Sequence, residues 1–210
     1  MKSVLVTGGT VRLGRAIAAR LRAEGWRVIT SSHRADAGAD IVADLSEPMG
    51  AAKLYAAALQ ILGGTPPDAL VNNAALFVGE AAAIAAVNFE APKKLTMMLA
   101  GREDAKGAVV NLVDLKAYGN AYGRTKSALT DYTRKSACLF AGSLRVNAVA
   151  PGPVLPPVGV HEPAGEILLD RRPAPEDVAA AVVYLLEAEA VTGVVLPVDA
   201  GQHLLEGTAC

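Results

Sequence analysis

The sequence predicts an α/β fold in which a doubly wound parallel sheet of about seven strands carries helices on both faces. Strand-like and helix-like patterns alternate along the whole chain, which is the order that right-handed β-α-β units produce. Apolar residues make up 52% of the chain and aromatic residues only 4%. An interior of Ala, Val and Leu suits helices that pack closely on a sheet. The first strand-like run also ends in a glycine-rich turn that leads straight into a helix-like segment.

The expected strands are short, mostly apolar runs. The first ends in Thr-Gly-Gly and the sixth is closed by Pro-Gly-Pro, and such continuous runs are typical of strands buried on both faces. The expected strands are Lys2–Val6, Arg27–Ser31, Asp40–Ala43, Ala69–Asn72, Ala108–Val113, Leu144–Val149 and Gly193–Val198.

The expected helices show apolar residues at helical spacing. In the first, Leu13, Ile17, Ala18 and Leu21 fall on one face. Proline marks two helix starts, and Pro92 predicts a break or restart inside the third helix. The expected helices are Arg12–Glu24, Ala51–Leu62, Glu80–Gly101, Ala121–Ala141, Gly165–Asp170 and Pro175–Glu187.

Length, charge and cysteine content narrow the class of protein. The 210 residues fit one domain spanning residues 1–210. A net charge of −1 without a basic or acidic block argues against nucleic acid and anionic membranes as partners. No apolar run reaches the roughly 18 residues of a membrane span. We do not expect the first residues to act as a signal peptide, because glycines interrupt their short apolar run. Cys138 and Cys210 have no metal or redox spacing, so we expect a cytoplasmic protein with reduced thiols and no metal site.

The glycine-rich turn Thr7-Gly8-Gly9-Thr10-Val11-Arg12-Leu13-Gly14 lies between the first strand and the first helix. Glycines there allow a tight turn and a close approach of pyrophosphate, and the helix N-terminus offers free N–H groups. The pattern is typical of a Rossmann-type dinucleotide site, although merely structural glycines are the alternative. The turn residues expected to contact the cofactor are Gly8, Thr10, Arg12 and Leu13.

The end of the second strand indicates which dinucleotide is bound. NAD-preferring sites usually carry an acidic residue there, whereas this chain has Ser31-Ser32-His33-Arg34. A hydroxyl, an imidazole and a guanidinium suit a 2′-phosphate, and Arg12 is able to clamp phosphate oxygens. NADPH is therefore favoured over NADH, unless His33 and Arg34 are only solvated loop residues.

Asp44 and Leu45 follow the third strand and are further candidates for cofactor binding. The carboxylate of Asp44 is able to accept a hydrogen bond from the adenine amino group. It is equally suited to cap the next helix, and the two roles are compatible.

Tyr122 and Lys126 are four residues apart at the start of a long helix, so they share one face of it. A nearby ammonium favours the phenolate and prepares the phenol to pass a proton. A solvent-facing pair is the alternative interpretation. The position of the pair favours catalysis, because Asn72 ends the fourth strand and Asn88 lies in the helix before the fifth.

With these residues in place, the chain resembles the short-chain dehydrogenase/reductase family along nearly its whole length. The matching segments are TGGTVRLG, Asp44-Leu45, NNA at 72–74, Asn88, YGRTK at 122–126, RVNAVAPGPV at 145–154, PED at 175–177 and VTGVVLPVDAGQHL at 191–204.

The resemblance implies roles for individual residues. Tyr122 would be the general acid, Lys126 would bind the nicotinamide ribose and tune Tyr122, and Asn88 would hold a water of the proton relay. The remaining residues that the resemblance places at the cofactor are Asn72, Ala74, Pro151 and Gly152.

One catalytic position departs from the general family pattern. Asp114 stands at the end of the fifth strand, where the family usually has serine. Together with Arg12 and His33-Arg34, this resembles the pteridine reductase branch, which includes dihydromonapterin and dihydrofolate reductases. That branch implies hydride transfer from NADPH to a C=N bond, with Tyr122 donating the proton alone or with Asp114 and a water. A carboxyl group also bonds more strongly than serine to the amino-pyrimidine edge of a pterin.

The loops over the site are shorter than is usual in the family. Asp114 and Tyr122 are only eight residues apart, and we assign the acid to Tyr122 rather than Tyr118 because only Tyr122 has a lysine four residues on. The short loop after Pro153 predicts a small lid that includes Leu155 and Val158, unless these residues only pack the loop. Such a pocket is open or completed by a neighbouring subunit.

Phe77 is the candidate for stacking on the substrate ring in the pteridine reductase reading, with an ordinary core phenylalanine as the alternative. Two other functions stay open. One is a ketoreductase acting on 3-oxoacyl thioesters or small ketones, and the other is a catalytically silent NADPH-binding regulatory protein. The family resemblance also implies a homotetramer formed through the helices at Ala85–Gly101 and Ala121–Ala141.

Overall fold

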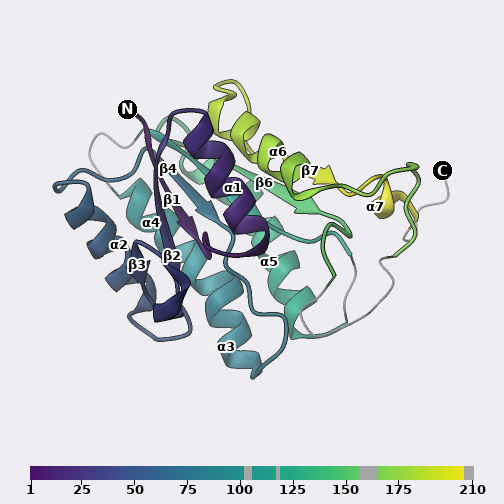
Figure 1. Ribbon diagram of the computed structural model, residues 1–210, viewed down its shortest axis with the longest axis horizontal. Helices are drawn as coiled ribbons and strands as arrows, with labels where there is room; N and C mark the ends of the chain where they lie inside the picture. Colours follow the sequence, from purple (N-terminus) through teal and green to yellow (C-terminus); the bar gives the residue numbers. More distant parts are fainter. Residues whose placement is uncertain (102–105, 117–118, 157–164, 206–210) are drawn as a thin grey trace.

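A computed structural model describes residues 1–101, 106–116, 119–156 and 165–205. Its seven strands form one parallel sheet in the order β3-β2-β1-β4-β5-β6-β7 (Figure 1). The predicted sheet is thus confirmed, with strand ends within two residues of those expected. The strands are β1 (Ser3–Thr7), β2 (Arg27–Ser32), β3 (Ile41–Val42), β4 (Ala69–Asn72), β5 (Gly107–Leu112), β6 (Leu144–Pro151) and β7 (Val195–Val198).

Helices follow most of the strands, and most lie where they were expected. They are α1 (Arg12–Ala23), α2 (Gly50–Ile61), α3 (Ala81–Ala85), α4 (Ala91–Ala100), α5 (Ala121–Leu139), α6 (Pro175–Glu187) and α7 (Gln202–Leu205). A 3-10 turn at Ala35–Ala37 follows β2, and a π turn at Ala86–Glu90 joins α3 to α4.

The expected helix at Gly165–Asp170 does not form. The backbone N–H groups of Leu168 and Leu169 donate to the carbonyl of Ala200 instead of closing a local helical turn. The short helix α7 was not expected. Asp199 stabilises its start, because the carboxylate accepts hydrogen bonds from the backbone N–H groups of Gly201 and His203.

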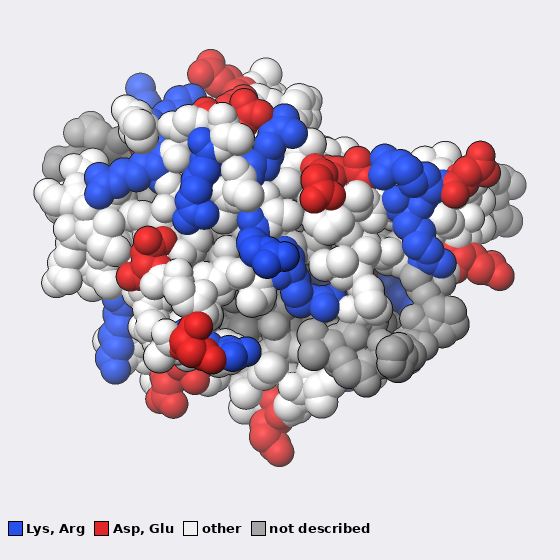
Figure 2. Space-filling view, viewed as in Figure 1, with Lys and Arg blue, Asp and Glu red and all other residues white. Residues whose placement is uncertain are grey.

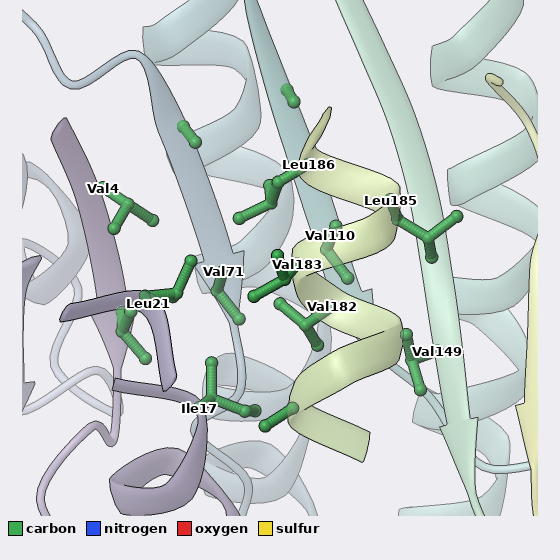
Figure 3. Packing of buried hydrophobic residues seen from close by; sticks show 14 of the residues in the cluster. Val4, Ile17, Leu21, Val71, Val110, Val149, Val182, Val183, Leu185 and Leu186 are labelled. Carbon is green, nitrogen blue, oxygen red and sulfur yellow. The ribbon is translucent and has the colours of Figure 1, made fainter. Parts of the chain in front are cut away.

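The helices cover both faces of the sheet. Helices α1 and α6 lie next to each other on one face, and α2, α4 and α5 cover the other (Figure 1). Figure 3 shows Ile17 and Leu21 of α1 packing with Val182 of α6 above the strands. The apolar face predicted for α1 is confirmed, since Ile17, Ala18 and Leu21 are buried and Leu13 packs against the same cluster.

The strand order reverses direction between β1 and β4, which is the point where open α/β sheets bind ligands at their carboxyl ends. Lys and Arg side chains are interspersed with Asp and Glu over the face drawn in Figure 2. None of the helices in the described part of the chain combines the length and the apolar character that a membrane span requires.

Candidate cofactor and catalytic site

A cavity of about 650 Å³ lies at the carboxyl ends of the strands. It is lined by the β1–α1 turn, the end of β2, the segments after β3, β4 and β6, and the start of α5. The expected cofactor residues that line this cavity are Gly8, Thr10, Arg12, Leu13, His33, Arg34, Asp44, Leu45, Ala74 and Gly152. The structure therefore brings most of the expected cofactor site together.

The glycine-rich turn depends on a close contact between α1 and the end of β1. A Cβ atom on Gly14 would lie 2.0 Å from the carbonyl oxygen of Gly8, so no other residue fits there without moving the backbone. Gly8 itself has a φ of 62°, a value that glycine adopts without strain. Asn73 then fixes the turn, because its Nδ2 donates to the carbonyl oxygens of Thr7 at 2.9 Å and Gly8 at 3.0 Å.

Asn73 is a site residue that the sequence reasoning did not single out. It lines the cavity and connects β4 to the glycine-rich turn. Its signal was present as the second asparagine of the NNA segment, but its partners lie 65 and 66 residues away in the chain.

The buried hydroxyl of Thr10 indicates what kind of ligand this cavity fits. The Oγ1 atom is buried and has no hydrogen-bond partner within the described structure, although Thr10 lines the cavity. Buried hydroxyl groups nearly always have a partner. The free Oγ1 beside a glycine turn and a helix N-terminus therefore fits a phosphate-bearing ligand that completes this wall.

Arg12 lies on the cavity in an unusual backbone conformation. Its φ is 50°, which costs on the order of 1 kcal/mol for a residue other than glycine. Its Nη2 donates to the carbonyl oxygen of Pro156 at 2.7 Å, so Arg12 joins the glycine-rich turn to the short loop after β6. The guanidinium retains further N–H donors for phosphate oxygens.

Asp44 stabilises a tight turn rather than a helix end. Its Oδ1 accepts hydrogen bonds from the backbone N–H of Ser46 at 2.8 Å and from the Ser46 hydroxyl at 2.7 Å, and these bonds lower the pKa of the Asp44 carboxyl. The residue at the N-cap of α2 is Met49. The predicted capping role of Asp44 is therefore wrong, while its place on the cavity agrees with adenine recognition.

Asn72 lies behind the cavity wall rather than on it. Its Nδ2 donates to Oδ1 of Asn111 at 2.8 Å, and Nδ2 of Asn111 donates to the hydroxyl of Thr133 at 2.9 Å. These bonds tie β4, β5 and α5 together inside the protein. The expectation that Asn72 lines the cofactor is corrected, and Asn73 and Ala74 take that place.

Gly152 lines the cavity just after β6, whereas Pro151, which was also expected at the cofactor, does not. Pro151 is the last residue of that strand. A Cβ atom on Gly152 would lie 2.5 Å from Cα of Asp199, so glycine lets the segment after β7 pack directly behind the cavity.

The predicted catalytic residues Asp114, Tyr122 and Lys126 lie together at the start of α5, beside the end of β5. The hydroxyl of Tyr122 donates to Oδ2 of Asp114 at 3.1 Å, and Oδ1 of Asp114 accepts from the backbone N–H of Lys116 at 2.9 Å. Nζ of Lys126 lies 5.7 Å from the centre of the Tyr122 ring and donates to the carbonyl oxygen of Leu112. Tyr122 and Lys126 thus share one helix face, as their spacing predicts.

Burial shifts both charged groups next to Tyr122 toward their neutral forms. It raises the pKa of the Asp114 carboxyl, against the hydrogen bonds from Lys116 and Tyr122. It lowers the pKa of Lys126 to about 8, a shift that the nearby Asp114 charge opposes. Two groups with shifted pKa values around a phenol are typical of a site that transfers protons.

Asn88 is fully buried on the π turn between α3 and α4. Pro92 has no N–H to donate to the carbonyl of Asn88 four residues earlier, and the backbone takes the wider π turn there in place of a break. The Asn88 side chain exchanges two hydrogen bonds with the backbone of Leu76 and donates to Thr125 at 3.3 Å. Asn88 thereby fastens the segment after β4 beside α5, and its water-holding role stays a prediction.

Phe77 stands beside Tyr122 at the surface. The two ring centres are 4.7 Å apart at an interplanar angle of 61°, and 42% of Phe77 is exposed. The alternative of an ordinary core phenylalanine is therefore wrong. Leu155 lines the cavity, whereas Tyr118, Val158 and Cys210 lie outside the described residues.

Comparisons with known proteins agree with this geometry. A family model described as enoyl-(acyl carrier protein) reductase matches residues 11–203. The putative ketoacyl reductase 2 of granaticin polyketide synthase from Streptomyces violaceoruber is 32% identical, over 96% of each chain. That alignment has 240 positions, more than the 210 residues of this chain, so the relative has residues without a counterpart here. The difference is in line with the shortened loops.

Two solved structures define the family further. FolM alternative dihydrofolate reductase 1 from Brucella canis, complexed with NADP, has a TM-score of 0.85 and 31% identity, covering 99% of this chain and 96% of its own. The 3-alpha-hydroxysteroid dehydrogenase from Pseudomonas sp. B-0831, complexed with NADH, has a TM-score of 0.82 and 27% identity, with both chains fully covered. This chain belongs to the short-chain dehydrogenase/reductase family of NAD(P)-dependent oxidoreductases.

Proposed function

We propose that this protein is an NADPH-dependent reductase that transfers hydride to a pteridine, with Tyr122 as the general acid. The observation that carries the proposal is the hydrogen bond from the Tyr122 hydroxyl to the Asp114 carboxylate, 3.1 Å long, where the family usually has serine. The FolM proteins of Brucella, which are 31% identical to this chain, also support a substrate of the dihydropterin or dihydrofolate type.

The cavity fits NADPH at the positions that the chain itself provides. The glycine-rich turn and the buried Thr10 hydroxyl would hold the pyrophosphate, His33 and Arg34 the 2′-phosphate, and Asp44 the adenine. Lys126 is buried, bonds to the carbonyl oxygen of Leu112 and is not among the residues that line the cavity, so it would bind the nicotinamide ribose only by redirecting its Nζ. The bound nicotinamide supplies the hydride that the reduction requires.

The chain's own groups supply the proton. As the C=N carbon of the substrate gains hydride, the ring nitrogen takes the proton of the Tyr122 hydroxyl, which yields CH–NH and a phenolate. The buried Lys126 cation lies 5.7 Å from that ring and stabilises the phenolate. A proton from solvent then returns to the phenolate through water, and the Asp114 carboxyl, whose pKa is raised by burial, is placed to take up that proton and pass it on to Tyr122. The Asp114 carboxyl group also suits the amino-pyrimidine edge of a pterin.

The position of Phe77 favours a substrate with a flat ring. The exposed Phe77 ring lies edge-on to Tyr122, so it offers an aromatic surface next to the proton donor. Offset stacking of a planar ring on such a surface contributes on the order of 1 kcal/mol. Leu155 would close the site from the loop after β6.

A ketoreductase is the second candidate, favoured by the 32% identity to a putative ketoacyl reductase. A ketone needs only a hydrogen bond to its developing oxyanion, so serine would suffice in place of Asp114. The intact Tyr122, Lys126 and Asn88 argue against a catalytically silent protein.

A substrate panel separates these functions. Purified protein is mixed with NADPH and, in turn, 7,8-dihydrobiopterin, dihydromonapterin, dihydrofolate and an acetoacetyl thioester, and cofactor oxidation is followed by absorbance. We expect turnover of at least one pteridine and little turnover of the thioester. Turnover of the thioester alone would replace the proposal with the ketoreductase, and tight NADPH binding without any turnover would favour the silent protein.

We also propose a cytoplasmic homotetramer formed through α4 and α5. Met97 on α4 and Leu139 at the end of α5 are exposed apolar side chains, which supports contact with other copies. Sedimentation of the wild-type protein and of Met97→Glu tests this assembly, and a wild-type monomer at all concentrations would contradict it.

A further inference from the structure

An ion pair lies on the rim of the cavity beside β2. Nε and Nη2 of Arg34 donate to the two carboxylate oxygens of Asp36, at 3.0 and 2.7 Å. The 3-10 turn at Ala35–Ala37, which ends at Gly38 with a φ of 64°, folds the carboxylate back onto the guanidinium. The pair is therefore bidentate, the strongest geometry for these two groups.

The Arg34–Asp36 pair lies at the part of the cavity that is expected to bind the 2′-phosphate. Ser32, His33, Arg34 and Ala37 all line the cavity, so Asp36 stands between two lining residues. Its carboxylate occupies two of the five N–H donors of the guanidinium that would hold a 2′-phosphate.

The Asp36 carboxylate would interact differently with NADPH and with NADH. The 2′-phosphate of NADPH must displace Asp36 from Arg34 or share the guanidinium with it, and in both cases two anions lie close together. The 2′-hydroxyl of NADH is uncharged and is able to donate a hydrogen bond to a carboxylate. The Asp36 charge therefore acts against the phosphorylated cofactor only. The hydrogen bond and charge of Arg34 lower the pKa of Asp36, so the carboxylate stays ionised at neutral pH.

We propose that Asp36 is a specificity-determining residue that weakens the binding of NADPH relative to NADH by competing for Arg34. The inference rests on the proposed NADPH site and adds to it an internal competitor.

The test is the affinity of Asp36→Asn for both dinucleotides, measured by isothermal titration calorimetry without substrate. Asn keeps the size of the side chain and removes its charge. Since the pair is exposed on both sides, we expect NADPH to bind about two- to fivefold more tightly and NADH to bind as in wild type. The gain should shrink when the ionic strength is raised, because both charges are screened. Asp36→Glu keeps the charge and should behave as wild type.

Glu24→Gln is the matched control. Glu24 forms a similar exposed pair with Arg20, at 2.8 Å, near the other end of α1, so its loss should leave both affinities unchanged. Unchanged or weaker NADPH binding by Asp36→Asn, or equal tightening of both dinucleotides, would overturn the inference while leaving the proposed function intact. A wild-type protein that binds neither dinucleotide would overturn both.

Discussion

The cofactor end of the cavity, beside β2, and the cluster around Tyr122, here called the catalytic end, are built from different kinds of contact. At the cofactor end, Arg34 and Asp36 are paired at the surface, with 61% and 69% of their side chains exposed. At the catalytic end, Lys126 is buried, and Asp114 accepts hydrogen bonds from Tyr122 and from a backbone N–H. Exposed pairs contribute little free energy, whereas a buried polar group that loses its partner is costly. Substitutions at the cofactor end should therefore change affinity by modest factors, and those at the catalytic end should change turnover by orders of magnitude.

The largest effect is expected when the proposed proton donor, Tyr122, is removed. Tyr122→Phe should lower kcat about 10²- to 10⁴-fold, which is the usual contribution of general acid catalysis, and should leave NADPH affinity nearly unchanged. Tyr184→Phe, at an exposed tyrosine on α6, is the control and should keep wild-type turnover. A Tyr122→Phe enzyme with wild-type kcat would contradict the expectation that substitutions at the catalytic end change turnover by orders of magnitude.

The glycine-rich turn is the exception at the cofactor end, because it depends on backbone contact rather than on charge. Gly14→Ala would place a methyl group 2.0 Å from the Gly8 carbonyl oxygen, so we expect a loss of about 1–3 kcal/mol or more in stability or NADPH binding. Gly119→Ala adds a methyl group into open space and is the control. Thermal melts with and without NADPH measure both effects, and a neutral Gly14→Ala would contradict the close packing of this turn.

The pH dependence of turnover reports on the buried charges. Lys126 has a pKa of about 8, so the cation that stabilises the phenolate is lost as pH rises through that value, and kcat/KM should fall there. Because the Asp114 charge raises the pKa of Lys126, Asp114→Asn should move this falling limb to lower pH. Asp131→Asn, an exposed carboxylate on the same helix, should leave it in place. A limb that stays fixed in Asp114→Asn would show that the two groups are not coupled.

A smaller effect is expected at the exposed Arg34. Arg34→Ala should weaken NADPH binding roughly tenfold and leave NADH binding and the kcat at saturating NADPH close to wild type. Equilibrium titration of both cofactors measures the difference. An equal loss for both dinucleotides would mean that Arg34 holds the loop rather than the 2′-phosphate.

The sheet and most helices could be predicted because they follow from local patterns. Buried parallel strands are continuous apolar runs, and the buried face of α1 repeats at helical spacing. The segment Gly165–Asp170 was predicted wrongly because its backbone bonds to Ala200, more than 30 residues later, and no local pattern contains that contact.

The same distinction applies to the site. Tyr122 and Lys126 could be paired from their spacing, and the glycine-rich turn from its composition. Asn72 and Asn73 could not be told apart, because only the tertiary structure shows which side chain turns toward β5 and which toward Gly8. The pairing of Asp36 with Arg34 was missed for another reason, since two residues so close in sequence meet only when the chain takes the 3-10 turn.

In the proposed function, Asp114 adapts the tyrosine site to a pteridine. The most direct test is the ratio of kcat/KM for a dihydropterin to that for an acetoacetyl thioester, in wild type and in Asp114→Ser. Loss of a charged hydrogen-bonding group from a buried site typically costs about 1.5–3 kcal/mol, so the ratio should favour the pterin in wild type and fall about tenfold or more in the variant. A ratio that is unchanged, or that favours the thioester in wild type, would contradict the account.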